Sequence, residues 1–365
     1  MIELIRQPDA ALSRELTEYL SAMGGCGRAQ RRHRADGLAE AGGEHDPRWL
    51  TVLHRALGHE PYLLIARRND GSQGICGYLP MVLVASRLFG RFLVSLPYVN
   101  RAGVVADDAD AAAALIDRAV QLADQLDVQY LELRRDGLPI HHPALGAQRD
   151  EKKRMLLDLP TDAAALWSSI GPKVRNQIRK ADKYNLTIRW GGPQLVTEFY
   201  DIFAVNMRDL GTPVYPRKLF DEILQRFDDQ AEFAVVDYEG QPIAAALLMH
   251  QADGVSQVPS ASCLRRYNFT NANMWMYHQL LLRAIDRKSR QFDFGRSSED
   301  SGTYQFKKQW GARPHHTVWQ YHVRRGDMNR MRPDSPRNRR RIAVWQKLPV
   351  RVATVLGPHI VRGIP

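Results

Sequence analysis

The chain of 365 residues has little cysteine and no long apolar run. Its three cysteines, Cys26, Cys76 and Cys263, lie far apart and form no CxxC motif, which argues against a disulfide framework or a zinc knot. No stretch approaches the roughly 18 apolar residues of a membrane span, and charged side chains recur where a signal peptide needs an apolar segment. These absences predict a protein of the reducing cytoplasm.

Several catalytic motifs are absent as well. The sequence contains no HExxH, no GxSxG and no Walker loop. The pairs His141-His142 and His315-His316 have no carboxylate or cysteine at ligand spacing, and neighbouring side chains on a strand point to opposite faces. We therefore predict no metal site.

The composition is that of a large globular protein. Hydrophobic residues make up 44% and charged residues 25%, and the length suits two domains. The formal charge of +11 is unevenly spread, because the segment from Arg324 to Arg341 holds eight arginines against Asp327 and Asp334. The folded body is predicted to be only mildly basic.

The most informative segment runs from Phe292 to Gly311 and has the sequence FDFGRSSEDSGTYQFKKQWG. Its pattern predicts a short apolar strand that ends at Gly295, a polar connection, and then an aromatic and basic helix. Polar residues at the carboxyl end of a strand are where open α/β sheets bind ligands. A cation from Lys307 or Lys308 at that place would stabilise an oxyanion or a phosphate. Asp293 is predicted to be a structural hydrogen-bonding residue.

A second segment, KVRNQIRKA from Lys173 to Ala181, predicts a basic helix. Starting at Pro172, apolar residues fall on one stripe at Val174, Ile178 and Ala181, so that one face docks and the remainder is cationic. The cationic face is either a solvated surface or a contact for phosphate or an RNA backbone. The residues alone leave both interpretations open.

The two segments together resemble the FemAB-like transferases, a branch of the GNAT acyltransferase superfamily. The resemblance rests on the basic helix, on DFGRS at 293–297, on Phe306-Lys307 and on Trp310-Gly311, and it covers about residues 151–323. It is closest to FemAB-related proteins found beside exosortase (PEP-CTERM) and exopolysaccharide gene clusters. Such proteins attach amino acids or other acyl groups to amines of cell-envelope precursors.

The order of predicted elements repeats along the chain, which agrees with the α/β (α+β) fold of tandem GNAT-like domains that the resemblance implies. Each domain would have a mixed central sheet flanked by helices. We predict domains over 1–150 and 151–323 and an Arg-rich amphipathic tail over 324–365. In the first half the pattern predicts strands over 62–67, 74–85, 92–105 and 128–134 and a helix over 108–126, and in the second half strands over 233–238, 241–251, 254–263 and 291–294 and a helix over 271–290.

The resemblance also implies roles for individual residues. Lys307 would stabilise the oxyanion or the leaving group. Apart from the resemblance, the position of Glu299 before the helix suits it to supply a general base or to cap that helix. Tyr215, held between two prolines, would face substrate or close an edge of the core. Tyr304 would contact substrate or pack its helix. The other predicted substrate-binding residues are Lys173, Arg175, Asn176, Arg179, Arg296 and Ser297.

The identity of the acyl donor stays open at this stage. The turn over 265–273, where CoA-dependent GNAT enzymes carry glycines that cradle the pyrophosphate, contains no glycine in this chain. We therefore predict no tightly bound cofactor and a donor that is either aminoacyl-tRNA or acyl-CoA. The acceptor would be a small-molecule or lipid-linked glycan. The alternatives are an acyl-CoA-dependent N-acetyltransferase on an amino sugar and a non-catalytic scaffold that binds glycan.

The tail has amphipathic character. From Ile342 to Pro365 apolar residues recur at three- and four-residue steps, broken by Pro349 and Pro358. This apolar side would either pack on the protein itself or contact an anionic membrane at the inner face, with Trp345 entering the headgroup layer.

Overall fold

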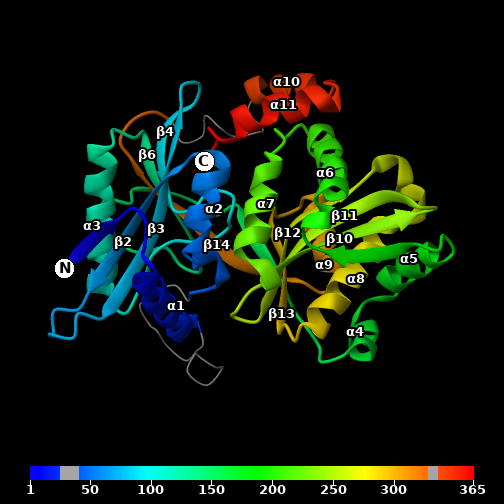
Figure 1. Ribbon diagram of the computed structural model, residues 1–365, viewed down its shortest axis with the longest axis horizontal. Helices are drawn as coiled ribbons and strands as arrows, with labels where there is room; N and C mark the ends of the chain where they lie inside the picture. Colours follow the sequence, from blue (N-terminus) through cyan, green and yellow to red (C-terminus); the bar gives the residue numbers. More distant parts are fainter. Residues whose placement is uncertain (25–40, 328–335) are drawn as a thin grey trace. The chain divides into compact units, whose positions relative to one another are not determined.

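The computed structural model describes residues 1–24, 41–327 and 336–365, with the side chains of residues 336 and 337 excepted. The chain forms two compact units. Unit 1 comprises Met1–Glu151, His316–Arg332 and Arg362–Pro365, and unit 2 comprises Lys152–His315 and Pro333–Val361 (Figure 1). The sequence had suggested a boundary after residue 150 and a separate tail. In the structure a C-terminal strand returns to unit 1, and the tail helices belong to unit 2.

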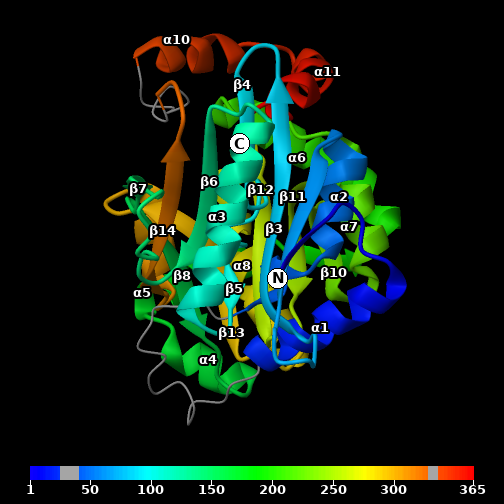
Figure 2. The same cartoon turned by 90° about the vertical axis from the view of Figure 1, so that its left-hand side faces the viewer.

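Unit 1 contains a mixed sheet with the strand order β1-β2-β3-β4-β6-β14, in which β4 and β6 are parallel. Its helix α3 packs on β2, β3 and β6 (Figure 2), and apolar side chains of α3 and these strands form one core. The elements are β1 (Ile2–Ile5), α1 (Ala10–Gly24), α2 (Arg48–Leu57), β2 (Glu60–Arg67), β3 (Ile75–Ser86), β4 (Gly90–Val94), β5 (Val105–Ala106), α3 (Ala109–Gln125), β6 (Tyr130–Asp136), β7 (Ala147–Arg149) and β14 (Arg313–Val323).

Unit 2 contains a second mixed sheet with the order β8-β13-β12-β11-β10-β9, in which β12 and β13 are parallel. The elements up to β10 are β8 (Lys152–Asp158), α4 (Ala163–Ser169), α5 (Pro172–Asp182), β9 (Thr187–Gly191), α6 (Val196–Leu210), α7 (Arg217–Arg226) and β10 (Ala231–Tyr238). The remaining elements are β11 (Gln241–His250), β12 (Val255–Cys263), the 3-10 helix η4 (Arg265–Thr270), α8 (Ala272–Asp286), β13 (Gln291–Ser298), α9 (Gly302–Gln309), α10 (Pro336–Trp345) and α11 (Val350–Val361).

Helices cover both faces of the sheet in unit 2. On β10, Phe233 stacks on Phe199 of α6 with ring centroids 4.3 Å apart, whereas the next residue, Ala234, belongs to the core that contains α5 and α8. Because neighbouring residues of a strand point to opposite faces, α6 lies on one face and α5 and α8 lie on the other. The predicted stripe of α5 docks into this core, since Val174, Ile178 and Ala181 are all buried.

The two units repeat one pattern. In each, an antiparallel hairpin is followed by a third strand, a crossover helix and a fourth strand that is parallel to the third. These elements are β2, β3, β4, α3 and β6 in unit 1, and β10, β11, β12, α8 and β13 in unit 2. The repeat confirms the predicted fold class of two related α/β halves, each with a mixed sheet flanked by helices.

Two predicted strands have different bounds in the structure. The extended segment expected over 92–105 is two strands, β4 and β5, because the chain turns between them with positive φ at Leu96 and Tyr98. The strand expected to end at Gly295 continues to Ser298 as β13. It passes Gly295 as a bulge with φ +75°, and the register with β8 shifts between Asp293 and Arg296.

The tail packs on unit 2. The indole Nε1 of Trp345 donates to the carbonyl of Thr212 at 3.1 Å, and Arg208 donates to the carbonyl of Leu348 at 2.7 Å. On α11, Gly357 is buried where an added Cβ would meet the backbone of Val214. Part of the apolar side therefore covers the protein itself, and Trp345 is one of its contacts. Among the described helices, none is long and apolar enough to cross a membrane.

Candidate functional site

The candidate site is built where β13 passes into α9. After the bulge the strand ends at Ser298, the chain turns, and α9 begins at Gly302. Ser301 caps the helix, because its Oγ accepts a hydrogen bond from the amide of Tyr304 at 3.2 Å. The hydroxyl of Ser297 donates to Thr303 Oγ1, also at 3.2 Å. These bonds fix the helix directly over the end of the strand.

This arrangement places Lys307 in a buried position over the bulge. Its side chain is 8% exposed, and Nζ donates to the carbonyls of Gly295 and Arg296, each at 3.1 Å. An ammonium has three N–H donors, and these two carbonyls are its acceptors within the described residues. The third N–H therefore has no acceptor within the described residues.

Burial changes the acidity of this amine. The pKa of Lys307 is lowered from 10.5 to about 8. Desolvation is the largest cause; the carboxylate of Asp293 opposes it, and the charges of Lys152 and Arg296 add to it. At neutral pH the side chain is thus mainly the ammonium form, which donates hydrogen bonds. At about pH 8 half of the Lys307 side chains have lost that proton.

A buried ion pair supports the bulge. Asp293 Oδ2 accepts from Arg154 Nε at 2.7 Å, and Oδ1 accepts from the amide of Gly295 at 2.7 Å. Both side chains are nearly inaccessible, at 0% for Asp293 and 4% for Arg154. The structural role predicted for Asp293 is confirmed. Its partner was not predicted, because Arg154 lies on β8 outside every motif and follows two lysines from which the sequence does not distinguish it.

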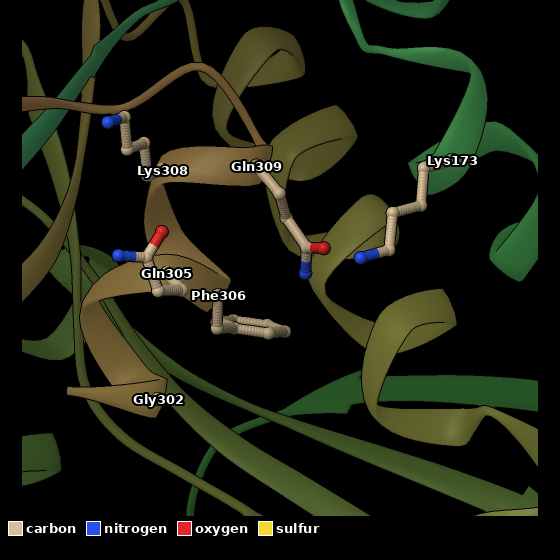
Figure 3. Close-up of a pocket in the computed structure, with 6 residues that line it drawn as sticks. All are labelled: Lys173, Gly302, Gln305, Phe306, Lys308 and Gln309. Carbon is tan, nitrogen blue, oxygen red and sulfur yellow. The ribbon is translucent and has the colours of Figure 1, made fainter. Parts of the chain in front are cut away.

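A pocket of about 420 Å³ lies beside α9. Figure 3 shows the side chains of Lys173, from the start of α5, and Gln309, from the end of α9, extending toward each other. The α9 residues Gln305, Phe306 and Lys308 line the same space. Residues of the two segments singled out in the sequence thus line one pocket, and the ammonium of Lys173 and the amide of Gln309 extend into the space between them, whereas Lys308 and Gln305 point away from that pair (Figure 3). Sequence reasoning missed Gln305 and Gln309, because neither belongs to a motif.

The basic side chains of α5 make different contacts. Lys173 is exposed at the pocket, and Asn176 is exposed on the same helix. The guanidinium of Arg175 instead donates to the backbone carbonyls of Ile170 at 2.6 Å and Trp167 at 3.2 Å, which fastens α5 to the end of α4. Arg179 is exposed, and its guanidinium lies 5.4 Å from the ring centroid of Trp167.

The remaining predicted residues differ in how deeply they are buried. Glu299 is exposed in the turn before α9, and Arg296 is half-buried on β13. Ser297 is buried, and the ring of Tyr304 belongs to the core of unit 2. Tyr215 is half-buried between α6 and α7, with its ring 5.9 Å from that of Phe203 and its carbonyl accepting from the hydroxyl of Tyr200.

In the turn before α8, several backbone amides already donate hydrogen bonds within the protein. Residues Arg265–Thr270 form the 3-10 helix η4, in which the amides of Tyr267 and Asn271 bond to carbonyls of the same turn. The first amide of α8, that of Ala272, donates to Thr270 Oγ1 at 3.2 Å. These groups are therefore already engaged and do not form an open cradle for a pyrophosphate.

The comparisons with known proteins agree with this architecture. Residues 172–308 match the acetyltransferase (GNAT) domain model. The structure is similar to the crystal structure of FemX, at 13% identity and a TM-score of 0.60, covering 88% of this chain and 97% of that one. It is also similar to a tandem GNAT protein from the clavulanic acid biosynthesis pathway, at 13% identity and a TM-score of 0.55, covering 90% and 100%.

A third similar structure is the C-terminal domain of a putative lysylphosphatidylglycerol synthetase from Agrobacterium fabrum, at 12% identity and a TM-score of 0.51, covering 78% and 89%. No curated protein sequence matches the chain. At these identities the solved structures establish the fold alone. Residues 172–308 thus match a GNAT domain, and the chain has the tandem GNAT-like fold that FemX also has.

Proposed function

We propose that the protein is an N-acyltransferase that moves an acyl or aminoacyl group onto an amine of a cell-envelope or exopolysaccharide precursor. The observation that carries the proposal is Lys307, a buried ammonium with one donor left over, on the same helix whose neighbouring residues line a pocket with Lys173. A GNAT domain match over the same residues supports this class of reaction.

The proposed reaction is direct aminolysis in a ternary complex. The acceptor nitrogen attacks the carbonyl carbon of the donor ester or thioester, so that a C–N bond forms and the C–O or C–S bond breaks. The amine loses a proton to a carboxylate such as Glu299 or to water, and the leaving oxygen or sulfur gains one. Lys307 stabilises the negative charge that develops on the carbonyl oxygen or the leaving group.

The pocket residues hold the charged part of a substrate. Lys173 and Lys308 neutralise phosphate, and the amides of Gln305 and Gln309 donate hydrogen bonds beside it. Either an aminoacyl-tRNA or a nucleotide-linked or lipid-linked glycan carries such phosphate. Phe306 gives the pocket an apolar wall.

We favour aminoacyl-tRNA as the donor, because the backbone amides before α8 are already bonded within η4 and Thr270. The second candidate is acyl-CoA-dependent N-acetylation of an amino sugar, which the acetyltransferase domain match favours. The third is a glycan-binding scaffold. An association with exosortase (PEP-CTERM) gene clusters would fit an exopolysaccharide acceptor.

Titration of the purified protein with acetyl-CoA and with charged tRNA separates the three functions. Saturable binding of charged tRNA supports the proposed donor, and saturable binding of acetyl-CoA supports the second candidate. Binding of neither, combined with binding of an amino-sugar glycan and no transfer product, would establish the scaffold and overturn the proposed reaction.

Charge reversal at the pocket should weaken substrate binding. We expect Lys173→Glu to raise KM about tenfold at low ionic strength, because a charge-assisted contact is lost, and the difference should shrink as salt screens the charges. Lys180→Glu is the matched control, because Lys180 is exposed on the same helix but outside the pocket lining. If both variants have the same KM at each salt concentration, Lys173 has no role in binding.

The lowered pKa of Lys307 should appear in the pH profile. If the ammonium is the active form, kcat/KM should decline as pH rises through about 8, where this group loses its proton. In Lys307→Arg the guanidinium stays protonated, so residual activity should show no decline there. An activity that instead rises through about 8 in the parent and not in Lys307→Arg would identify Lys307 as a base.

A further inference from the structure

The C-terminal helices present an unusual outer surface. Within the described residues, Val344, Val352, Val355 and Leu356 are exposed by 65%, 39%, 66% and 44%. Four of the eleven large exposed apolar side chains thus fall within 13 residues of α10 and α11, whereas the others are spread over the rest of the described chain. This concentration calls for a partner, since isolated exposed apolar side chains are ordinary but clusters are not.

Helix geometry places these side chains away from the protein. On α11, Ala353, Gly357 and Val361 form the buried stripe at four-residue steps. At about 100° per residue, Val352 and Val355 lie on the side opposite that stripe. The exposed apolar side chains are therefore additional to the ones that hold the tail on unit 2.

The same holds on α10. Its inner side is defined by Ile342, whose side chain packs at Gly211, and by Trp345, bonded to Thr212. Val344 and Arg340 point away from that side and are separated by four residues, so they are neighbours on one exposed face.

The charge around this surface has one sign. Residues 336–365 contain seven basic side chains and no aspartate or glutamate, so this segment carries +7 of the formal +11. Arg339, Arg340, Arg341, Lys347 and Arg351 are exposed on the same two helices and their connection. Together they form what we call the tail surface: Arg339, Arg340, Arg341, Val344, Lys347, Arg351, Val352, Val355 and Leu356.

We propose that the tail surface binds the face of an anionic phospholipid bilayer. Its cations meet the lipid phosphates, and its valines and leucine enter the boundary between headgroups and acyl chains. A nucleic acid would satisfy the cations but not the apolar part, because bases stack on aromatic rings and the exposed apolar side chains here are aliphatic. Attachment in this manner is reversible and brings unit 2 to lipid-linked molecules.

Vesicle co-sedimentation of the full chain tests the proposal without donor or acceptor, so its outcome is independent of the proposed reaction. We expect binding to phosphatidylcholine vesicles that contain phosphatidylglycerol, at least tenfold weaker binding to phosphatidylcholine alone, and weakening by salt. Arg339→Gln, Arg340→Gln and Arg341→Gln combined should reduce the partition coefficient about a hundredfold, because each basic residue near such a surface contributes about fivefold.

A second variant tests the apolar part. Val344→Asp combined with Val355→Asp should reduce partition at least tenfold, with the thermal midpoint unchanged because both sites are exposed. The matched controls are Leu138→Asp and Arg55→Glu, which alter an exposed leucine and an exposed arginine of unit 1. The proposal is overturned if the parent does not bind the anionic vesicles, if the tail variants bind like the controls, or if single-stranded RNA binds and vesicles do not.

Discussion

Replacement of Lys307 by alanine is expected to lower kcat about tenfold to a thousandfold, the range for losing one preorganised electrostatic contact to a developing negative charge. The free energy of unfolding should change little. The variant loses two hydrogen bonds to the bulge, but it also removes a buried charge whose desolvation is unfavourable. The measurement is single-turnover transfer from the donor identified by titration, with thermal unfolding of the same sample. Product formation at the parental rate would remove Lys307 from the reaction.

Lys308→Ala is the matched comparison for Lys307→Ala, and it is also expected to affect the kinetics. It is rotated by about 100° from Lys307 around α9 and lines the pocket instead of facing the bulge. Lys308→Ala should therefore raise KM and leave kcat nearly unchanged, whereas Lys307→Ala should act on kcat. Equal effects of both changes on kcat would contradict the separate roles.

Loss of Asp293 should have the largest effect on stability. Asp293→Ala leaves the guanidinium of Arg154 buried without its carboxylate and removes the acceptor of the Gly295 amide. Breaking a buried pair in this way costs about 3–5 kcal/mol of unfolding free energy. Urea unfolding followed by tryptophan fluorescence measures the difference. The same variant should also lose activity, because the bulge that carries the acceptors of Lys307 is no longer held.

Two control variants show whether the loss of unfolding free energy in Asp293→Ala comes from the buried ion pair. Combining Asp293→Leu with Arg154→Met should restore most of the stability, because a buried pair replaced by apolar groups is often tolerated. Asp124→Ala, which breaks an exposed ion pair with Arg324, should cost less than about 1 kcal/mol. A cost for Asp293→Ala as small as that of Asp124→Ala would show that the buried pair does not stabilise the bulge.

Periodicity predicted the elements that position the site. The apolar stripe of α5 and the hairpin over β10 and β11 were evident because helices and strands repeat at fixed spacings. The end of β13 was not evident. Gly295 looked like a strand break, whereas it is a bulge, and only the pairing of β13 with β8 distinguishes the two.

The contents of the site were harder to predict than its location. The sequence indicated cations near the crossing, but it did not show that Arg175 would be used by the backbone of the α4 to α5 connection. It also could not show that Gln309 would face Lys173, because that pairing depends on where two segments far apart in the chain, α5 and α9, come to line the same pocket. A motif identifies residue types, and the packing of distant segments decides which atoms remain free.

The pairing of β8 with β13 has a consequence for the order of folding. Arg154 and Asp293 are separated by 139 positions in the chain, so their contact closes a very long loop. The β10–β11 hairpin closes through a short turn and forms with far less loss of chain entropy. The surroundings of Lys307 are therefore among the late parts of unit 2 to assemble. A chain in which the β10–β11 hairpin has formed is still inactive until β8 pairs with β13.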